Sequence, residues 1–221
     1  MTRLAERERS SRLTLGHKAG KKVVDVSLSL ALIIILAPLL LLLYFLVRAT
    51  SAGPGLFRQE RLGQNMRPFT MLKLRTMCTD NDDSIHREYM IRMLSADQQE
   101  AGPDGLFKLV RDPRVTPLGR WLRRSSLDEL PQLFNVLRGD MSLVGPRPIL
   151  PWEAQLFGVE YQRRFQVKPG ITGLWQVSGR SRLSMQQALE LDVEYALRHS
   201  LALDLSIILR TVPAVLRGGA R

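Results

Sequence analysis

Arginines and carboxylates crowd into one stretch of this 221-residue chain, and their chemistry suggests a site for a phosphate-rich ligand. The carboxylates are Asp128, Glu129 and Asp140, and the arginines are Arg111, Arg114, Arg120, Arg123, Arg124, Arg138 and Arg147. Guanidinium groups bind phosphate oxygens bidentately. A carboxylate among such cations is expected to stay ionised. An ionised aspartate beside bound phosphate suits covalent phosphoryl chemistry.

Asp128 and Glu129 also have a structural interpretation. Ser126 and Glu129 fit a capping box, with Ser126 as the N-cap of a helix and Glu129 at the third helical position. A helix N-terminus is itself an anion site. The residue pattern alone therefore leaves Asp128 open between a role in helix capping and a role in catalysis.

Three further cations are candidate phosphate ligands. The rigid turn Gly145-Pro146-Arg147-Pro148 projects one arginine, although it also fits a simple connector. Two strands are predicted over residues 56–61 and 68–77, and in the second strand Lys73 and Arg75 share a face. A solvated basic edge strand is the alternative interpretation for this pair.

Other familiar sites are absent from the sequence or weakly indicated. The glycine-rich residues 168–180 could line a nucleotide site, but no phosphate-binding loop of NTPases and no dinucleotide fingerprint occurs. Cys78 is the single cysteine, and the three histidines lie far apart, so a disulfide framework or a zinc site is excluded. Asp80, Asp82 and Asp83 are predicted to lie in a solvated loop.

A long uncharged run indicates a membrane helix near the N-terminus. Residues 26–47 carry no charge, and leucine and isoleucine dominate them. Such a run is typical of a helix in a bilayer. A buried core helix fits less well because every face is apolar. A cleaved signal peptide fits less well because no small-residue cleavage site follows.

Pro38 and the flanking charges favour a helix that enters the membrane and returns. Pro38 removes a backbone hydrogen bond in mid-run, so we expect a kink or break there. Cations flank the run on both sides, and the positive-inside rule then places both ends in the cytoplasm. We therefore expect a basic segment over residues 1–22, a re-entrant membrane helix over 23–50, and a catalytic domain on the cytoplasmic face over 51–221.

The rest of the chain predicts a predominantly helical α+β fold. Ser184 and Gln187 form a second capping box, which begins a helix that continues to about His199. Residues 201–216 are strongly apolar and are expected to pack on the core or lie at the membrane interface. The net charge of +11 suggests an anionic partner, but no nucleic-acid-binding module is recognisable, so nucleic acid is not expected.

Taken together, these motifs closely resemble those of the bacterial sugar transferases, the monotopic phosphoglycosyl transferases that act on polyprenyl phosphate. The resemblance covers about residues 20–216 and is most similar to the minimal, exopolysaccharide-priming type. It rests on the mid-helix proline and on the motifs Lys73-x-Arg75-Thr76-Met77, Arg111-Asp112-Pro113-Arg114, residues 126–132, residues 139–148 and residues 169–173. One departure is Ala37 before Pro38, where some members have serine.

The resemblance implies a reaction and a set of roles. A hexose 1-phosphate would pass from a UDP-sugar to undecaprenyl phosphate with release of UMP, at the cytoplasmic face of the bacterial inner membrane. Asp128 would be the nucleophile and Glu129, with Asp128, would hold Mg²⁺. The phosphate contacts would come from Arg123, Arg147, Lys73 and Arg75.

Two other readings of the chain stay open at this stage. One is a transferase without a covalent intermediate, in which Asp128 serves as a base or a metal ligand. The other is a membrane-tethered scaffold, without catalysis, in a polysaccharide assembly complex. Accumulation of a phosphosugar-enzyme would exclude the first, and release of UMP would exclude the second.

Overall fold

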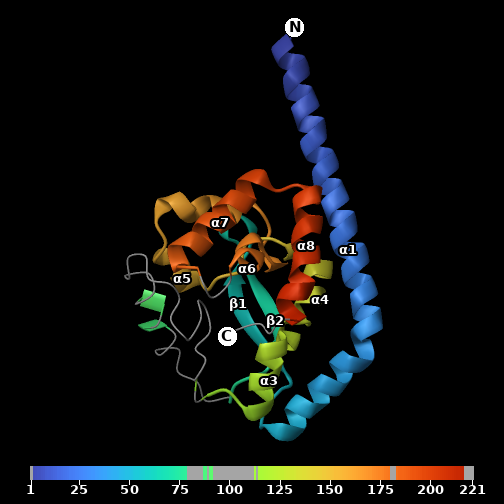
Figure 1. Ribbon diagram of the computed structural model, residues 1–221, viewed down its shortest axis with the longest axis vertical. Coiled ribbons are helices and arrows are strands. Elements are labelled where there is room, and N and C mark those ends of the chain that lie inside the picture. Colours follow the sequence, from blue (N-terminus) through green and yellow to red (C-terminus); the bar gives the residue numbers. More distant parts are fainter. Residues whose placement is uncertain are drawn as a thin grey trace.

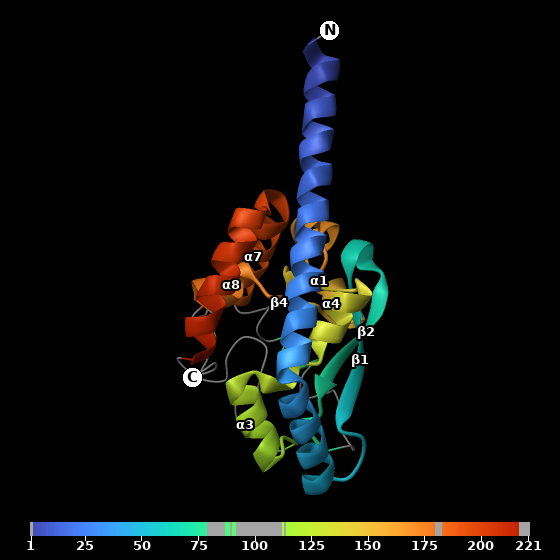
Figure 2. The same ribbon diagram turned by 90° about the vertical axis from the view of Figure 1, so that its right-hand side faces the viewer.

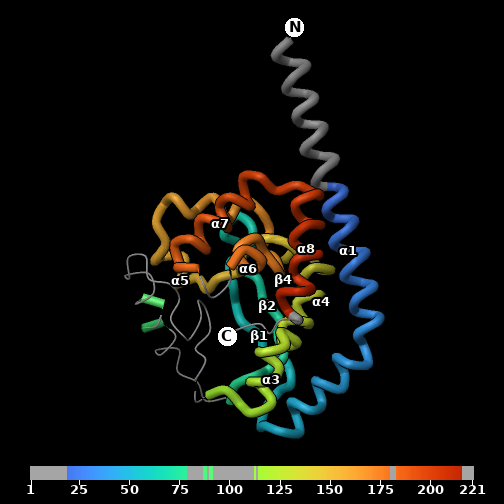
Figure 3. The backbone as a smooth tube through the Cα atoms, in the orientation of Figure 1, coloured from blue at the N-terminus to red at the C-terminus, as the bar shows by residue number. Residues whose placement is uncertain are grey.

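The computed structural model describes residues 2–78, 87, 88, 90, 91, 112, 114–179 and 183–216, with side chains from residue 19 onward. Figure 3 shows in colour the part of the chain whose side chains are described, which begins at residue 19, with the remaining residues in grey. A long N-terminal helix runs along one side of a small domain of short helices and strands (Figure 1). The expected acidic loop at Asp80, Asp82 and Asp83 lies outside the described residues, as does Arg111.

Helix α1 (Thr2–Thr50) contains the whole predicted membrane segment. Its stretch from Ala19 to Thr50 is long and apolar enough to cross a membrane. The helix stays continuous through Pro38, so the predicted break is a bend. Figure 1 shows this change of direction before the chain enters the domain, and proline accounts for it.

One face of α1 packs on the domain and the opposite face is bare. Near its C-terminal end, Leu43 and Val47 are 2% exposed and form a cluster with Leu74 and Leu122. The opposite face exposes large apolar side chains, among them Ile34, Ile35, Leu41, Leu42 and Phe45. Figure 2 shows α1 lying in front of the domain along its length. The bare apolar face is the part of α1 that suits lipid.

The two predicted N-terminal strands are confirmed. Strand β1 (Leu56–Leu62) pairs antiparallel with β2 (Pro68–Leu74), and Phe57 lies opposite Lys73. A short 3₁₀ turn, η1 (Gln64–Met66), joins them. Strand β2 ends at Leu74, which is three residues earlier than predicted, so Arg75 lies beyond the pleated strand.

The segment around Asp128 differs from the prediction. Helix α3 (Pro117–Ser125) ends at Ser126, whose φ of 57° is left-handed. A 3₁₀ turn, η2 (Leu127–Glu129), follows, and α4 (Gln132–Arg138) begins only after Pro131. Ser126 makes no side-chain capping bond, so the predicted capping box is wrong: Ser126 ends one helix instead of beginning another.

The C-terminal half is mostly helical around a second small sheet. Strand β3 (Ser142–Val144) pairs parallel with β4 (Gly170–Thr172). The helical elements that surround them are α5 (Pro151–Gln155), η3 (Val159–Gln166), α6 (Leu174–Ser178), α7 (Met185–Arg198) and α8 (Leu201–Leu216). The predicted capping box at Ser184 and the predominantly helical α+β class are confirmed.

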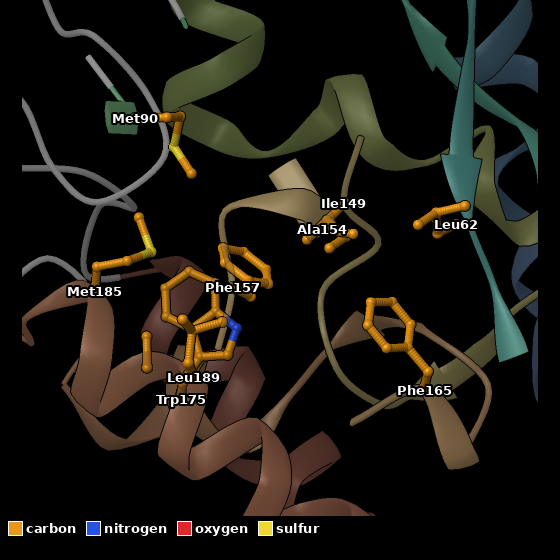
Figure 4. Packing of buried hydrophobic residues seen from close by; sticks show 10 residues of the cluster. Leu62, Met90, Ile149, Ala154, Phe157, Phe165, Trp175, Met185 and Leu189 are labelled. Atoms are coloured by element: carbon orange, nitrogen blue, oxygen red, sulfur yellow. The ribbon is translucent and has the colours of Figure 1, made fainter. Parts of the chain in front are cut away.

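Two hydrophobic clusters hold this half together. One joins the segment after α5, η3, α6 and α7 through Phe157, Phe165, Trp175 and Leu189, which Figure 4 shows from close by. The other includes Val144 and Tyr195 and is closed by apolar side chains of α1 and α8. The strand ends and turns between these clusters carry the candidate site.

Candidate active site

A polar cleft lies where β2, η2, α4, β4 and α6 meet. Its lining residues are Met71, Lys73, Glu129, Gln132, Arg147, Pro148, Gly170, Ile171 and Gln176. Three of the predicted site residues, Lys73, Glu129 and Arg147, therefore come together from segments that are far apart in the sequence. The cleft thus combines two cations with a carboxylate, as a charged ligand would require.

Glu129 is held toward the cleft by Lys73. The Lys73 Nζ lies 3.4 Å from Glu129 Oε1, and both side chains are about 15% exposed. Strand β2 is fixed beside this pair because Asn135 of α4 accepts from Leu72 N at 3.0 Å and donates to Thr70 O at 2.7 Å. The fully buried Asn135 side chain makes the hydrogen bonds with the main chain of β2 that a neighbouring strand would otherwise make. These bonds fix the position of β2, and with it the distance between Lys73 and η2.

Asp128 is 3% exposed and lies close to Arg123. Burial lowers the pKa of the Arg123 guanidinium, and the negative charges of Asp128 and Asp112 oppose that change. Arg114 and Arg147 lower the same pKa through like-charge repulsion. Arg123 therefore feels the charges of both acids and of both other arginines, and a bound phosphate would relieve the repulsion among the cations.

Arg123 and Arg114 are each oriented by a polar neighbour. Arg123 donates from Nε to Thr76 Oγ1 at 3.0 Å. Arg114 binds Asp112 through two nitrogens, with Nη2 at 2.7 Å from Oδ2 and Nε at 2.9 Å from Oδ1. The hydrogen bond from Arg114 lowers the pKa of Asp112 below its ordinary value, although burial opposes it. Asp112 is therefore a fixed anion that positions Arg114.

Arg75 lies outside this group. It is 5% exposed, and its guanidinium donates to backbone carbonyls at the end of α1: Ser51 O at 2.9 Å, Gly53 O at 3.2 Å, and Ala52 O. These carbonyls belong to the bend that follows α1, and Val47 O in the last turn of the helix lies 3.5 Å from the same guanidinium. The phosphate contact expected of Arg75 has no support in this geometry, and we leave the residue out of the site.

The carboxylates fit one way of binding Mg²⁺. Among the described residues no three His, Cys, Asp or Glu side chains come together as metal ligands. Mg²⁺ is commonly held by one or two carboxylates, with substrate phosphates and water completing its coordination. The neighbouring Asp128 and Glu129 match that donor set.

Several site residues have no role in the sequence prediction. Gln132 and Gln176 line the cleft, and Thr76 orients Arg123. Asp192 has a signal in the sequence, because it continues the apolar stripe of α7 formed by Met185, Ala188, Leu189 and Tyr195. A lone acid on the buried face of a helix is costly unless it is paired, so such a residue marks a polar contact inside the domain.

Comparison with known proteins gives concordant matches. A model of the bacterial sugar transferase family matches residues 16–218. The UDP-glucose:undecaprenyl-phosphate glucose-1-phosphate transferase of Caulobacter vibrioides is 43% identical over 204 residues, covering 89% of this chain and 69% of that protein. The exopolysaccharide production protein ExoY of Sinorhizobium fredii is 40% identical over 89% of this chain and 85% of its own length.

Longer proteins match the same region. The UDP-galactose-lipid carrier transferase of Erwinia amylovora is 39% identical over 197 residues, which is 89% of this chain. The chain spans only about 40% of the length of that relative. The shared region therefore contains the cleft, Asp128 and the apolar helix, whereas the remainder of the longer relative has no counterpart in these 221 residues.

Proposed function

The chain belongs to the bacterial sugar transferase family, and from that premise we propose that it transfers a hexose 1-phosphate from a UDP-sugar to undecaprenyl phosphate, releasing UMP. The observation that carries the proposal is the cleft that Glu129, Lys73 and Arg147 line, next to the buried Asp128 whose charge acts on Arg123. A pyrophosphate needs such cations before a carboxylate can approach its phosphorus.

The first half of the reaction would form a covalent intermediate. A carboxylate oxygen of Asp128 attacks the β-phosphorus of the UDP-sugar, and the bond from that phosphorus to the bridging oxygen of UMP breaks. UMP leaves with the bonding electrons, and the sugar phosphate stays on Asp128 as an acyl phosphate. Arg123 and Arg147 bind the phosphate oxygens and stabilise the charge that builds up on them.

The second half would return Asp128 to its starting state. An oxygen of undecaprenyl phosphate attacks the same phosphorus, and the acyl phosphate bond to Asp128 breaks. The product is undecaprenyl diphosphate carrying the hexose, and the carboxylate is free again. Lys73, paired with Glu129 on the edge of the cleft, is placed to meet the incoming phosphate.

Mg²⁺ is the cofactor we propose. Glu129 and Asp128 would hold the ion together with donor phosphate oxygens. When bound, it would neutralise part of the pyrophosphate charge.

The acceptor lipid explains the long apolar helix. Undecaprenyl phosphate is insoluble in water, so the cleft must lie at a bilayer surface. We propose that α1 enters the membrane, bends at Pro38 and returns, so that the domain stays on the cytoplasmic face of the inner membrane. Exposed cations near both ends of the apolar stretch, Lys22, Arg48 and Arg58, suit anionic headgroups. The bend in α1 supports this arrangement.

The test is release of UMP by protein in detergent or nanodiscs, with Mg²⁺, undecaprenyl phosphate and a panel of UDP-sugars. We expect release with one donor, and we expect Asp128→Asn to lower kcat by at least about 10³-fold with an unchanged melting temperature. An Asp128→Asn variant with the wild-type rate would exclude the nucleophile. No release with any donor, from folded protein, would favour a non-catalytic scaffold.

The covalent step has its own test. Radiolabelled sugar phosphate should stay on the wild-type protein when donor is supplied without acceptor, and one UMP should be released per labelled enzyme. Turnover without any labelled enzyme would favour direct transfer, with Asp128 as a base.

A further inference from the structure

Main-chain hydrogen bonds join the segment around Arg147 to the rest of the domain, both before and after the arginine. Before the arginine, Gly145 N donates to Thr172 O at 2.9 Å. After it, Ile149 O accepts from Leu62 N, also at 2.9 Å. The turn between these two points is short and contains two prolines, Pro146 and Pro148. The direction of the Arg147 side chain is therefore set by how the middle of this turn is held.

A buried ion pair holds the middle of the turn. Arg164 of η3 donates from Nη2 to Arg147 O at 2.9 Å. The same nitrogen lies 2.5 Å from Oδ2 of Asp192 in α7, so the two side chains form an ion pair. Burial raises the pKa of the Asp192 carboxyl, whereas the main chain and the charge of Arg147 lower it. The carbonyl of Arg147 is thus held by an arginine that Asp192, from a different element, holds in turn.

The pair is costly for the domain to contain. The side chains of Arg164 and Asp192 are 1% and 4% exposed. Arg164 Nε and Nη1 have no hydrogen-bond partner among the described residues, and the guanidinium lies 5.5 Å from the ring centres of Phe157 and Phe165. Apolar side chains often stabilise a core as well as a buried ion pair does. Core stability alone therefore does not explain why the domain contains this ion pair. Its contact with the main chain of Arg147 gives it a second role.

We propose that Arg164 and Asp192 are positioning residues that act through the main chain of Arg147 and aim its guanidinium into the cleft. The inference rests on the proposed function, in which Arg147 binds donor phosphate. Positional errors of about 1 Å in such a contact cost about 10²-fold in rate. The sequence separates the three residues, and only the packing of η3 and α7 against the turn brings them together.

A double-mutant cycle on kcat/KM for UMP release separates positioning from stability. In otherwise wild-type protein we expect Asp192→Asn to lower kcat/KM by about 10- to 100-fold. In an Arg147→Ala background, where there is no guanidinium to aim, the same change should cost less than about twofold. Arg147→Lys provides a second background with higher residual activity. An equal loss in all backgrounds would overturn the proposal.

Two further variants serve as controls. Leu189→Ala lies one turn before Asp192 on α7, and it should destabilise this helix by leaving a cavity in the hydrophobic cluster of Figure 4. Its effect on kcat/KM should be the same factor with and without Arg147. Glu194→Gln removes an exposed ion pair with Arg198 on the same helix and should change neither activity nor melting temperature.

If the Asp192→Asn protein does not fold, a double variant with apolar side chains in place of Arg164 and Asp192 provides the test. Arg164→Met combined with Asp192→Leu removes both charges and is expected to restore a stable core. We expect this double variant to melt near the wild-type temperature while kcat/KM stays about 10- to 100-fold low. Wild-type kcat/KM in a stable double variant would show that the pair has no positioning role.

Hydrogen–deuterium exchange tests the same inference without catalysis. Asp192→Asn should speed exchange at the amide of Gly145, which binds the turn to Thr172 O, more than Leu189→Ala does at matched stability. Unchanged exchange there would refute the positioning role even in an active enzyme. Faster exchange in a protein that releases no UMP with any donor would instead refute only the proposed function.

Discussion

Replacing Arg75 by methionine should destabilise the protein and leave the chemistry of the folded enzyme intact. The guanidinium is 5% exposed and binds the carbonyls of Ser51, Ala52 and Gly53, where α1 ends and the chain turns into β1. Methionine fills a similar volume but donates no hydrogen bond. The change therefore removes the bonds that hold the bend between α1 and β1, and Arg75 does not line the cleft.

The size of the effect follows from the contacts. A hydrogen bond to a charged group contributes roughly 1.5–3 kcal/mol, and the Arg75 guanidinium makes several to carbonyls at one helix end. Ala52 and Gly53 are exposed, so water can replace part of the loss at their carbonyls. We expect a destabilisation of about 3–5 kcal/mol, which corresponds to a melting temperature lower by roughly 6–20 °C for a chain of this size.

Lys73→Met is the matched comparison, because Lys73 lies two residues earlier on β2 and points to Glu129 in the cleft. Thermal unfolding in nanodiscs and kcat/KM for UMP release are measured for both variants. Arg75→Met should lower the melting temperature with kcat/KM within about threefold of wild type, measured well below that temperature. Lys73→Met should leave the melting temperature unchanged and lower kcat/KM by about 10-fold or more. An Arg75→Met protein of normal stability but raised KM would show that Arg75 binds donor phosphate after all.

Three other perturbations have definite outcomes. Pro38→Ala should straighten α1 and carry its N-terminus across the membrane, which an Arg3→Cys label in a Cys78→Ser background reports; continued labelling from the cytoplasm would count against it. Ser126→Gly should keep or raise stability by up to about 1 kcal/mol, because the φ of 57° is left-handed, whereas a capping serine would lose stability. Burial raises the pKa of Asp192 to about 6, opposed by the guanidinium beside it, so the folded state takes up a proton between pH 3.8 and 6 that the unfolded chain does not. Wild type should therefore gain stability relative to Asp192→Asn as the pH falls from 7 to 5, and a difference in melting temperature independent of pH would contradict the assignment.

Elements with strong local signals could be predicted from the sequence. The capping box at Ser184 fixes the start of α7 through bonds within four residues, with Ser184 N and Gln187 Oε1 2.9 Å apart. The apolar run of α1 and the bend at Pro38 follow from composition and from the chemistry of proline. The strands β1 and β2 follow from residue type and from the turn between them. In each case the determining contacts lie close in the chain.

Features determined by distant contacts could not be predicted. The residue types at positions 126–129 fit a capping box whether Ser126 begins a helix or ends one. The packing of α3 and α4 around these residues decides between the two, and here Ser126 ends α3. Arg75 and Lys73 share a strand pattern, yet one binds the end of α1 and the other binds Glu129, because β2 stops between them. The place of Asp192 on the buried stripe of α7 indicates a polar contact, but nothing in the sequence indicates that its partner is Arg164, 28 positions away.

The contacts of α1 bear directly on how the protein meets the membrane. Lys21, which lies shortly before the apolar run, binds Asp204 of α8 at 2.7 Å and Val144 O at 3.1 Å. Asp25, one turn further on, accepts from Leu143 N at 3.0 Å.

The other end of the apolar stretch packs on the same domain through Leu43 and Val47. These contacts agree with the proposed re-entrant arrangement, in which both ends of the apolar stretch stay on the side of the membrane where the domain lies. In that arrangement the bend at Pro38 would let α1 keep both sets of contacts while its bare apolar face meets lipid. Because Val144 immediately precedes the turn that carries Arg147, the contact of Lys21 with Val144 O would then also fix the cleft relative to the bilayer.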